Sequence, residues 1–165
     1  MRNIFKKSLL FIATCLIAGM AQAVTIYESD LVQNGTKFTA AGQGSFSTTA
    51  VSWASSYSNY WKTGSSTNKT TLTFSPALSL SGYSNVKMTI AWGHTSAGKK
   101  MRVFVNGTEI TSVTDGTLTA TAANTLYSAT VAITGNEINT ITFQGQGTSG
   151  LTVFHFAITG DGEGG

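Results

Sequence analysis

Four aromatic residues lie close together in a polar stretch of the chain, and they are the side chains best suited to contact a ligand. Trp53, Tyr57, Tyr60 and Trp61 fall among serine, asparagine, lysine and glycine rather than among aliphatic residues. Rings on a polar loop expose apolar area, which soluble proteins seldom leave without a use. Flat rings beside hydroxyl and amide groups suit the face and rim of a sugar. The cluster predicts a carbohydrate platform, and the alternative is that Trp53 and one tyrosine fold inward.

The histidines and carboxylates give little indication of catalysis. The chain has two histidines, His94 and His155, and neither has a carboxylate or cysteine at the spacing of a metal site or a catalytic triad. A catalytic histidine needs an orienting partner and a nucleophile within reach. Glycoside hydrolysis usually needs two carboxylates that face each other across a cleft, and no pair in this sequence indicates one. We therefore expect surface or edge positions for both histidines, and a protein that is not an enzyme.

One group of carboxylates could bind a cation. Glu28 and Asp30 lie two residues apart on an expected strand, so their side chains share a face, and pairing with the last strand could bring Asp161 near them. Oxygen ligands of this kind are what Ca²⁺ prefers. Two interpretations remain open: a structural calcium site at Glu28, Asp30 and Asp161, or solvated carboxylates beside the end of a strand.

The first 23 residues have the form of an export signal. Basic residues precede the apolar run 9–18, and Ala21-Gln22-Ala23 is a small-residue cleavage pattern. The apolar run is shorter than the roughly 20 residues that span a bilayer. We expect a signal peptide over 1–23, bacterial-type export to a secreted or cell-surface location, and no stable membrane association. A lipid anchor at Cys15 is the less favoured alternative.

Removing the signal peptide changes the charge of the protein. The whole chain has ten Lys and Arg against seven Asp and Glu, which gives a net charge of +3. Arg2, Lys6 and Lys7 account for that excess, so the remaining chain is formally neutral. Phosphate binding needs a surplus of basic residues, so nucleic acid is not expected as a partner. The single cysteine, Cys15, is lost with the signal, and the mature domain contains no disulfide.

The elements that must position these residues are β-strands. Apolar and polar residues alternate over 86–92, 101–105 and 127–134, and Asn106-Gly107 is a turn signal. The last strand, 151–159, is expected to place Phe154, Phe156 and Ile158 on one face, while Trp92 is expected in the core. Short antiparallel strands without a convincing helix predict an all-β, two-sheet β-sandwich over 24–160. Residues 161–165 are expected to form a flexible glycine-rich tail, either a frayed end or a link to a downstream domain.

Several motifs resemble the galactose-binding-like jelly rolls, especially the carbohydrate-binding modules of secreted glycoside hydrolases. The likeness lies in the opening strand IYESDL, in GYSNVKMTI, in the strand and turn MRVFVNGT, and in EINTITF before the final loop. It extends over nearly all of the chain after residue 23.

The resemblance implies a jelly-roll sandwich, calcium at Glu28 and Asp30, and a sugar site where the loop 57–61 meets the loop 145–147. In that last loop Gln146 is the amide nearest to the position where the family has an asparagine. The expected function is a secreted, non-catalytic module that binds a glycan or polysaccharide through Trp53, Tyr57, Tyr60, Trp61 and Gln146. The alternative is a structural or adhesive extracellular domain that mediates protein–protein contacts.

Overall fold

The computed structural model describes residues 22–29, 44–47, 49–63, 69–146 and 151–162. These residues are almost entirely strands, with one short 3-10 turn, η1 (Ser52–Ala54). Most of the expected signal peptide lies outside this part of the chain. Within it, no helix has the length and apolar character to cross a membrane.

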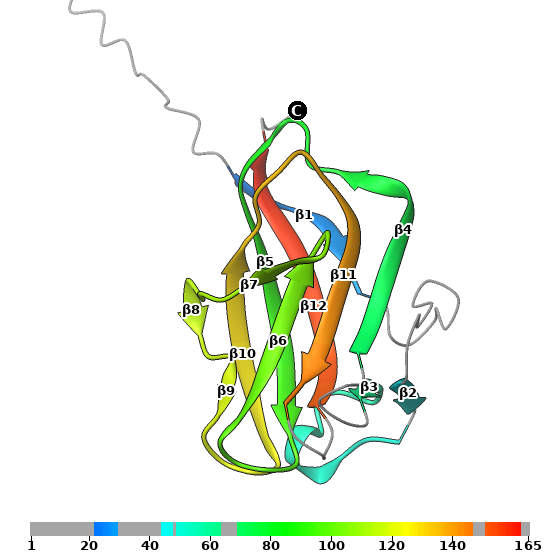
Figure 1. The fold of residues 1–165 in the computed structure, drawn as a ribbon, viewed down its shortest axis with the longest axis vertical. Coiled ribbons are helices and arrows are strands. Elements are labelled where there is room, and N and C mark those ends of the chain that lie inside the picture. Colours follow the sequence, from blue (N-terminus) through cyan, green and yellow to red (C-terminus); the bar gives the residue numbers. More distant parts are fainter. Residues whose placement is uncertain (1–21, 30–43, 48, 64–68, 147–150, 163–165) are drawn as a thin grey trace, which may run out of the picture.

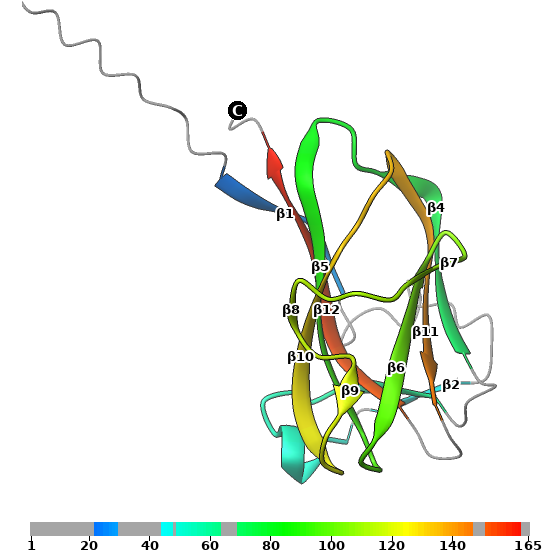
Figure 2. The ribbon, with the colours of Figure 1, turned by 60° about the vertical axis from the view of Figure 1, so that its left-hand side comes forward.

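The strands form two antiparallel sheets packed face to face (Figures 1 and 2). In the first sheet the order is β2 (Gly44–Ser47), β3 (Tyr60–Thr63), β12 (Leu151–Gly162), β5 (Tyr83–His94), β10 (Thr125–Ala132) and β8 (Asp115–Gly116), and β1 (Gln22–Glu28) also pairs with β12. In the second sheet the order is β4 (Lys69–Ser79), β11 (Glu137–Gly145), β6 (Lys99–Val105) and β7 (Thr108–Ile110), and β9 (Thr119–Ala120) pairs with β6. The long strands from β4 to β12 alternate between the sheets. The expected all-β, two-sheet sandwich of jelly-roll type is confirmed.

The core lies between the sheets and follows the period-two pattern of the strands. On β5 every second residue from Val86 to Trp92 is buried, and β6 repeats this from Met101 to Val105. Alternate residues of a strand point to opposite faces, so one face of each strand enters the core. Trp92 is fully buried, as expected, and its Nε1 donates a hydrogen bond to the carbonyl oxygen of Thr117 at 2.9 Å.

The turn between β6 and β7 forms where the sequence indicates one. Asn106 and Gly107 both have positive φ, at 50° and 78°. Such angles suit an asparagine–glycine pair in a tight hairpin. The Asn106 side chain also reaches β11, because its Oδ1 accepts hydrogen bonds from the backbone N–H groups of Asn139 and Thr140 at 2.7 and 3.1 Å.

A β-bulge in β12 changes which residues face the core. The pairing of β12 with β5 shifts between Val153 and His155, so that Phe154 is an extra residue on its strand. The expectation that Phe154 shares a face with Phe156 and Ile158 is therefore wrong. Phe156 and Ile158 belong to the core cluster, whereas Phe154 contacts the aromatic residues that follow β2.

The pairing of β1 with β12 extends further than the sequence indicates. It runs from Glu28 opposite Ala157 to Gln22 opposite Gly162. Asp161 and Gly162 therefore belong to a strand rather than to a flexible tail, which corrects the expected end of the domain at Gly160. Residues 163–165 lie outside the described part of the chain.

Candidate functional site

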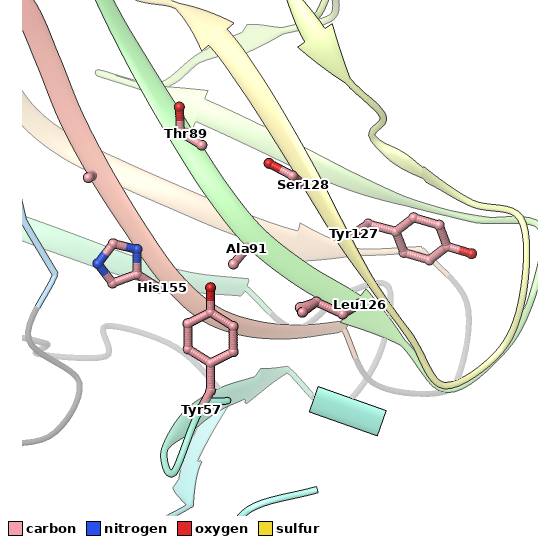
Figure 3. A pocket seen from close by; sticks show the side chains of 8 residues that line it. Tyr57, Thr89, Ala91, Leu126, Tyr127, Ser128 and His155 are labelled. Atoms are coloured by element: carbon pink, nitrogen blue, oxygen red, sulfur yellow. The ribbon is translucent and has the colours of Figure 1, made fainter. Parts of the chain in front are cut away.

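A groove of about 340 Å³ lies on the outer surface of the first sheet, above β5 and between β12 and β10 (Figure 3). Among the described residues, eight line it: Tyr57, Thr89, Ala91, Leu126, Tyr127, Ser128, His155 and Ala157. They come from three adjacent strands and from the segment between η1 and β3. Most of the site therefore lies on hydrogen-bonded strands of one sheet, which give a rigid support for a ligand.

The groove is hollow because the outward residues of its floor are small. On β5 the outward positions are Thr89, Ala91 and Gly93, and the neighbouring strands add Ala157 and Ser128. Cross-strand neighbours on one face have Cβ atoms about 5 Å apart, so larger residues at these positions would fill the space. A strip of small residues between larger ones leaves a depression.

Trp53 packs on Gly93, two residues from Ala91 along β5. A Cβ atom built on Gly93 would lie 2.4 Å from Cζ3 of Trp53 and 2.7 Å from the carbonyl oxygen of Thr125. Atoms that are not bonded do not approach so closely, so the indole can pack here only because residue 93 has no side chain. Trp53 is half-buried in this position.

The aromatic residues of the 53–60 segment surround Phe154. The ring of Tyr57 is stacked on Phe154 with the centroids 5.4 Å apart, while Trp53 and Tyr60 make edge contacts with it at 5.1 and 5.9 Å. Phe154 is only 2% exposed in consequence. Aromatic pairs at these distances contribute about 0.5–1.5 kcal/mol beyond the burial of area. This cluster holds Tyr57 in place. Of the four aromatic residues expected to form the platform, Tyr57 is the one that borders the groove.

The expected platform of four exposed rings does not form. Trp61 is 5% exposed and belongs to the core cluster. It lies opposite Val153 in the pairing of β3 with β12. Cross-strand partners share a face, and Val153 is a core residue, so Trp61 also faces inward. Trp53 and Tyr60 are half-buried against Phe154 and do not line the groove.

Gln146 does not join this site. Its Oε1 accepts a hydrogen bond from the backbone N–H of Lys100 at 3.2 Å, which places it beside the start of β6 in the second sheet. It is not among the residues that line the groove. The expected meeting of the loops 57–61 and 145–147 is therefore not supported at Gln146, and residues 147–150 lie outside the described part of the chain.

The three expected calcium ligands do not form one site. Glu28 lies opposite Ala157 and Asp161 lies opposite Ala23, four positions further along β12. At about 3.3 Å per residue this separates the backbones of the two residues by roughly 13 Å. Asp161 instead accepts a hydrogen bond from Nδ2 of Asn85 at 2.6 Å. Asp30 lies outside the described residues, so calcium at Glu28 and Asp30 stays a prediction.

Glu28 contacts His155, and no sequence motif links these two residues. Nε2 of His155 lies 3.0 Å from Oε1 of Glu28, and the two side chains are 31% and 66% exposed. The residues are 127 positions apart. Their contact could have been predicted only by pairing the first strand with the last in the correct register. His155 also stacks on Tyr57, with the ring centroids 6.5 Å apart.

The other histidine occupies a different environment. His94 is fully buried, which corrects the expectation of a surface or edge position. It lies on the same face of β5 as Trp92, two residues away, and its Nδ1 accepts a hydrogen bond from the backbone N–H of Ser96 at 3.0 Å. His94 is thus part of the end of the core rather than of the groove.

Tyr127 lies on β10, beside the groove, and its side chain points away from it in Figure 3. Its hydroxyl oxygen accepts a hydrogen bond from the backbone N–H of Ala122 at 2.6 Å and lies 3.1 Å from Oγ1 of Thr121. The hydrogen bond with Thr121 is the main reason that the pKa of Tyr127 is lowered, and partial desolvation opposes it. Tyr127 therefore organises the loop before β10.

The polar groups that line the groove come from different strands. Ser128 on β10 and His155 on β12 are separated by β5. The groove combines apolar surface with hydroxyl groups and an imidazole.

No family model matches the chain, and no curated protein matches it either. Among solved structures, the chain is similar to an exo-β-1,3-galactanase from Phanerochaete chrysosporium, solved with galactose. The similarity has a TM-score of 0.46 at 13% sequence identity, and it covers 83% of this chain and 29% of the galactanase chain. This chain thus spans less than a third of that protein, and a likeness at this level extends to neither activity nor substrate.

Proposed function

We propose that this protein is an exported, non-catalytic β-sandwich that binds a glycan in the groove above β5. The observation that supports the proposal most is the combination of Tyr57 and His155 with the hydroxyl groups of Thr89 and Ser128 around an apolar floor. A sugar ring presents an apolar face together with a rim of hydroxyl groups, so this lining is complementary to it.

The size and the rigidity of the groove support the same proposal. Its volume of about 340 Å³ lies at the lower end of the range of ligand pockets, about 300–1,000 Å³. The floor is formed by paired strands, and Tyr57 is fixed by its stacking on Phe154. Little conformational entropy would therefore be lost on binding, although a shallow site of this kind buries limited area and gives modest affinity.

Substitution of Tyr57 tests the proposal. Tyr57→Ala is expected to abolish binding on a glycan array, because it removes the ring that borders the groove. Tyr83→Ala is the matched control, since Tyr83 is an exposed tyrosine of the same sheet that pairs with Gly162, opposite the first residue of β1, and does not line the groove. Circular dichroism and thermal unfolding would establish that both variants fold. Retention of wild-type binding by a folded Tyr57→Ala variant would refute the proposal.

Filling the groove provides a second test that leaves the aromatic cluster intact. Ala91 lies on the floor with its side chain outward. Ala91→Leu is expected to abolish glycan binding, because the added atoms occupy the space of the ligand. The matched control is Ala132→Leu at an exposed position on β10 that does not line the groove.

A contact with another protein is the second candidate function. Leu126 is 37% exposed beside the groove, and Ala91 and Ala157 make much of the floor apolar. An apolar surface of this kind also suits a protein partner. Binding of a purified surface protein that Ala91→Leu abolishes, together with no glycan binding by the wild type, would favour this function.

A further inference from the structure

His155 presents one of its two ring nitrogens to the groove. Nε2 lies 3.0 Å from Oε1 of Glu28, whereas Nδ1 lies on the side of Ala91, the floor of the groove (Figure 3). No described residue forms a hydrogen bond with Nδ1. The His155 side chain is 31% exposed and lines the groove.

The contact with Glu28 determines which nitrogen carries the proton. An ionised carboxylate only accepts hydrogen bonds, so Nε2 must donate to it. In the neutral imidazole one nitrogen is a donor and the other is an acceptor. Nδ1 therefore carries a lone pair that points toward the groove.

We propose that Glu28 is a positioning residue that fixes the tautomer of His155, so that Nδ1 accepts a hydrogen bond from a hydroxyl group of the ligand. This inference rests on the proposed function, because it assigns a role within the same groove. It also defines the ligand more narrowly as a neutral compound with a hydroxyl donor. No Lys, Arg, Asp or Glu is among the described residues that line the groove, and the carboxylate of Glu28 beside His155 disfavours an acidic sugar.

The tautomer can be measured without any ligand. Long-range ¹H–¹⁵N correlation spectra distinguish a protonated ring nitrogen from an unprotonated one, and His155→Ala identifies the signals of His155 against those of His94. In the wild type at a pH where the ring is neutral, we expect Nδ1 unprotonated and Nε2 protonated. A protonated Nδ1 in the wild type would overturn the inference.

Two substitutions of Glu28 test its role. Glu28→Ala removes the acceptor, so the ring is expected to exchange between both tautomers and to give averaged nitrogen signals. Glu28→Lys places a donor beside Nε2, and the proton is then expected to move to Nδ1. Glu137→Ala and Glu137→Lys are the matched controls, because Glu137 is an exposed carboxylate on β11 in the other sheet. Unchanged His155 signals in both Glu28 variants would overturn the inference.

Binding of neutral disaccharides tests the hydrogen bond to the ligand. Cellobiose, laminaribiose, lactose and maltose would be titrated into the wild type and the variants. For a disaccharide that binds, we expect Glu28→Ala to weaken the affinity less than about threefold, because the ligand selects the tautomer with an unprotonated Nδ1, which stays populated. Glu28→Lys, which moves the proton to Nδ1, is expected to weaken the affinity about three- to tenfold, the effect of losing one hydrogen bond. The Glu137 variants are expected to bind like the wild type.

The outcomes separate this inference from the proposed function. If a disaccharide binds and Tyr57→Ala abolishes binding, but Glu28→Lys binds like the wild type, the inference is wrong and the proposed function stands. If neither the four disaccharides nor a glycan array binds the wild type, the proposed function fails, and the role of Nδ1 toward a ligand fails with it.

Discussion

The ring of Tyr57 is stacked on Phe154, with the centroids 5.4 Å apart and the planes at 28°. Tyr57 lies in the segment after η1, and Phe154 is the extra residue of the bulge in β12. The bulge turns Phe154 out of the core, and the stacking then fixes Tyr57 beside the groove. A backbone irregularity in one strand thus positions the aromatic residue of the candidate site.

Replacement of Phe154 is expected to affect both stability and binding. Phe154→Ala should lower the free energy of unfolding by about 3–5 kcal/mol, because Phe154 is 2% exposed and makes three aromatic contacts. Phe154→Leu should cost less and keep the fold while releasing Tyr57, so glycan affinity falls. Urea unfolding and a glycan titration measure the two effects. Phe104→Leu, in the second sheet, is the control, and equal affinities of the two leucine variants would contradict the role of Phe154.

Gly93→Ala is expected to destabilise the first sheet. The new methyl group would clash with the indole of Trp53 and with the carbonyl oxygen of Thr125, and the strain of such overpacking is about 1–3 kcal/mol. Adding Trp53→Ala should recover only part of this cost, because the clash with backbone at Thr125 remains. A double-mutant cycle of urea-unfolding free energies measures the coupling. Additive effects of the two substitutions would show that Trp53 does not pack on Gly93.

Asn106→Ala is expected to lower the free energy of unfolding by about 2–4 kcal/mol. Asn106 has positive φ, which alanine adopts with strain, and its side chain makes three hydrogen bonds to β11 or to its start. Asn124→Ala is the control, because Asn124 also has positive φ but no side-chain hydrogen bond is found for it within the described residues. The free energy of unfolding is measured by urea unfolding. If both variants lose a similar amount, the strain of positive φ, rather than the side-chain hydrogen bonds of Asn106, accounts for the effect.

Acidification is expected to remove a small stabilising contribution of Glu109. The hydrogen bonds from Arg102, at 2.8 and 2.6 Å, are the main cause of the lowered pKa of Glu109. A carboxyl group with a lowered pKa in the folded state stabilises the protein above its pKa in the unfolded state, and loses this effect as the pH falls through the folded pKa. The difference in Tm between the wild type and Glu109→Gln should therefore be positive near pH 7 and shrink toward zero as the pH falls through the folded pKa of Glu109. A difference that is constant over this range would contradict the linkage.

Much of the fold could be predicted from the sequence, because the alternation of apolar and polar residues within a strand shows which of its faces is buried. The alternation from Val86 to Trp92 and from Met101 to Val105 gives the faces that meet in the core, and Asn106-Gly107 gives the turn with positive φ. Each of these features depends on the side chains of a few consecutive residues. No knowledge of the distant chain is needed to find them.

The candidate site was only partly predictable, because its residues meet through long-range pairing. The sequence indicated the aromatic segment 53–61, but it could not show that Trp61 faces the core through its pairing with Val153. It also could not show the groove, whose floor is a strip of small side chains on three strands that are far apart in the chain.

The sequence by itself determined the β-sandwich and the buried position of Trp92. It also indicated the segment 53–61, which contributes an aromatic residue to the candidate site. The tertiary structure decided which ring borders the groove and which carboxylate contacts which side chain. The register of β1 against β12 brings Glu28 to His155 and separates it from Asp161. The reason is physical: local periodicity fixes the face on which a residue lies, whereas strand register and a single bulge fix its neighbours.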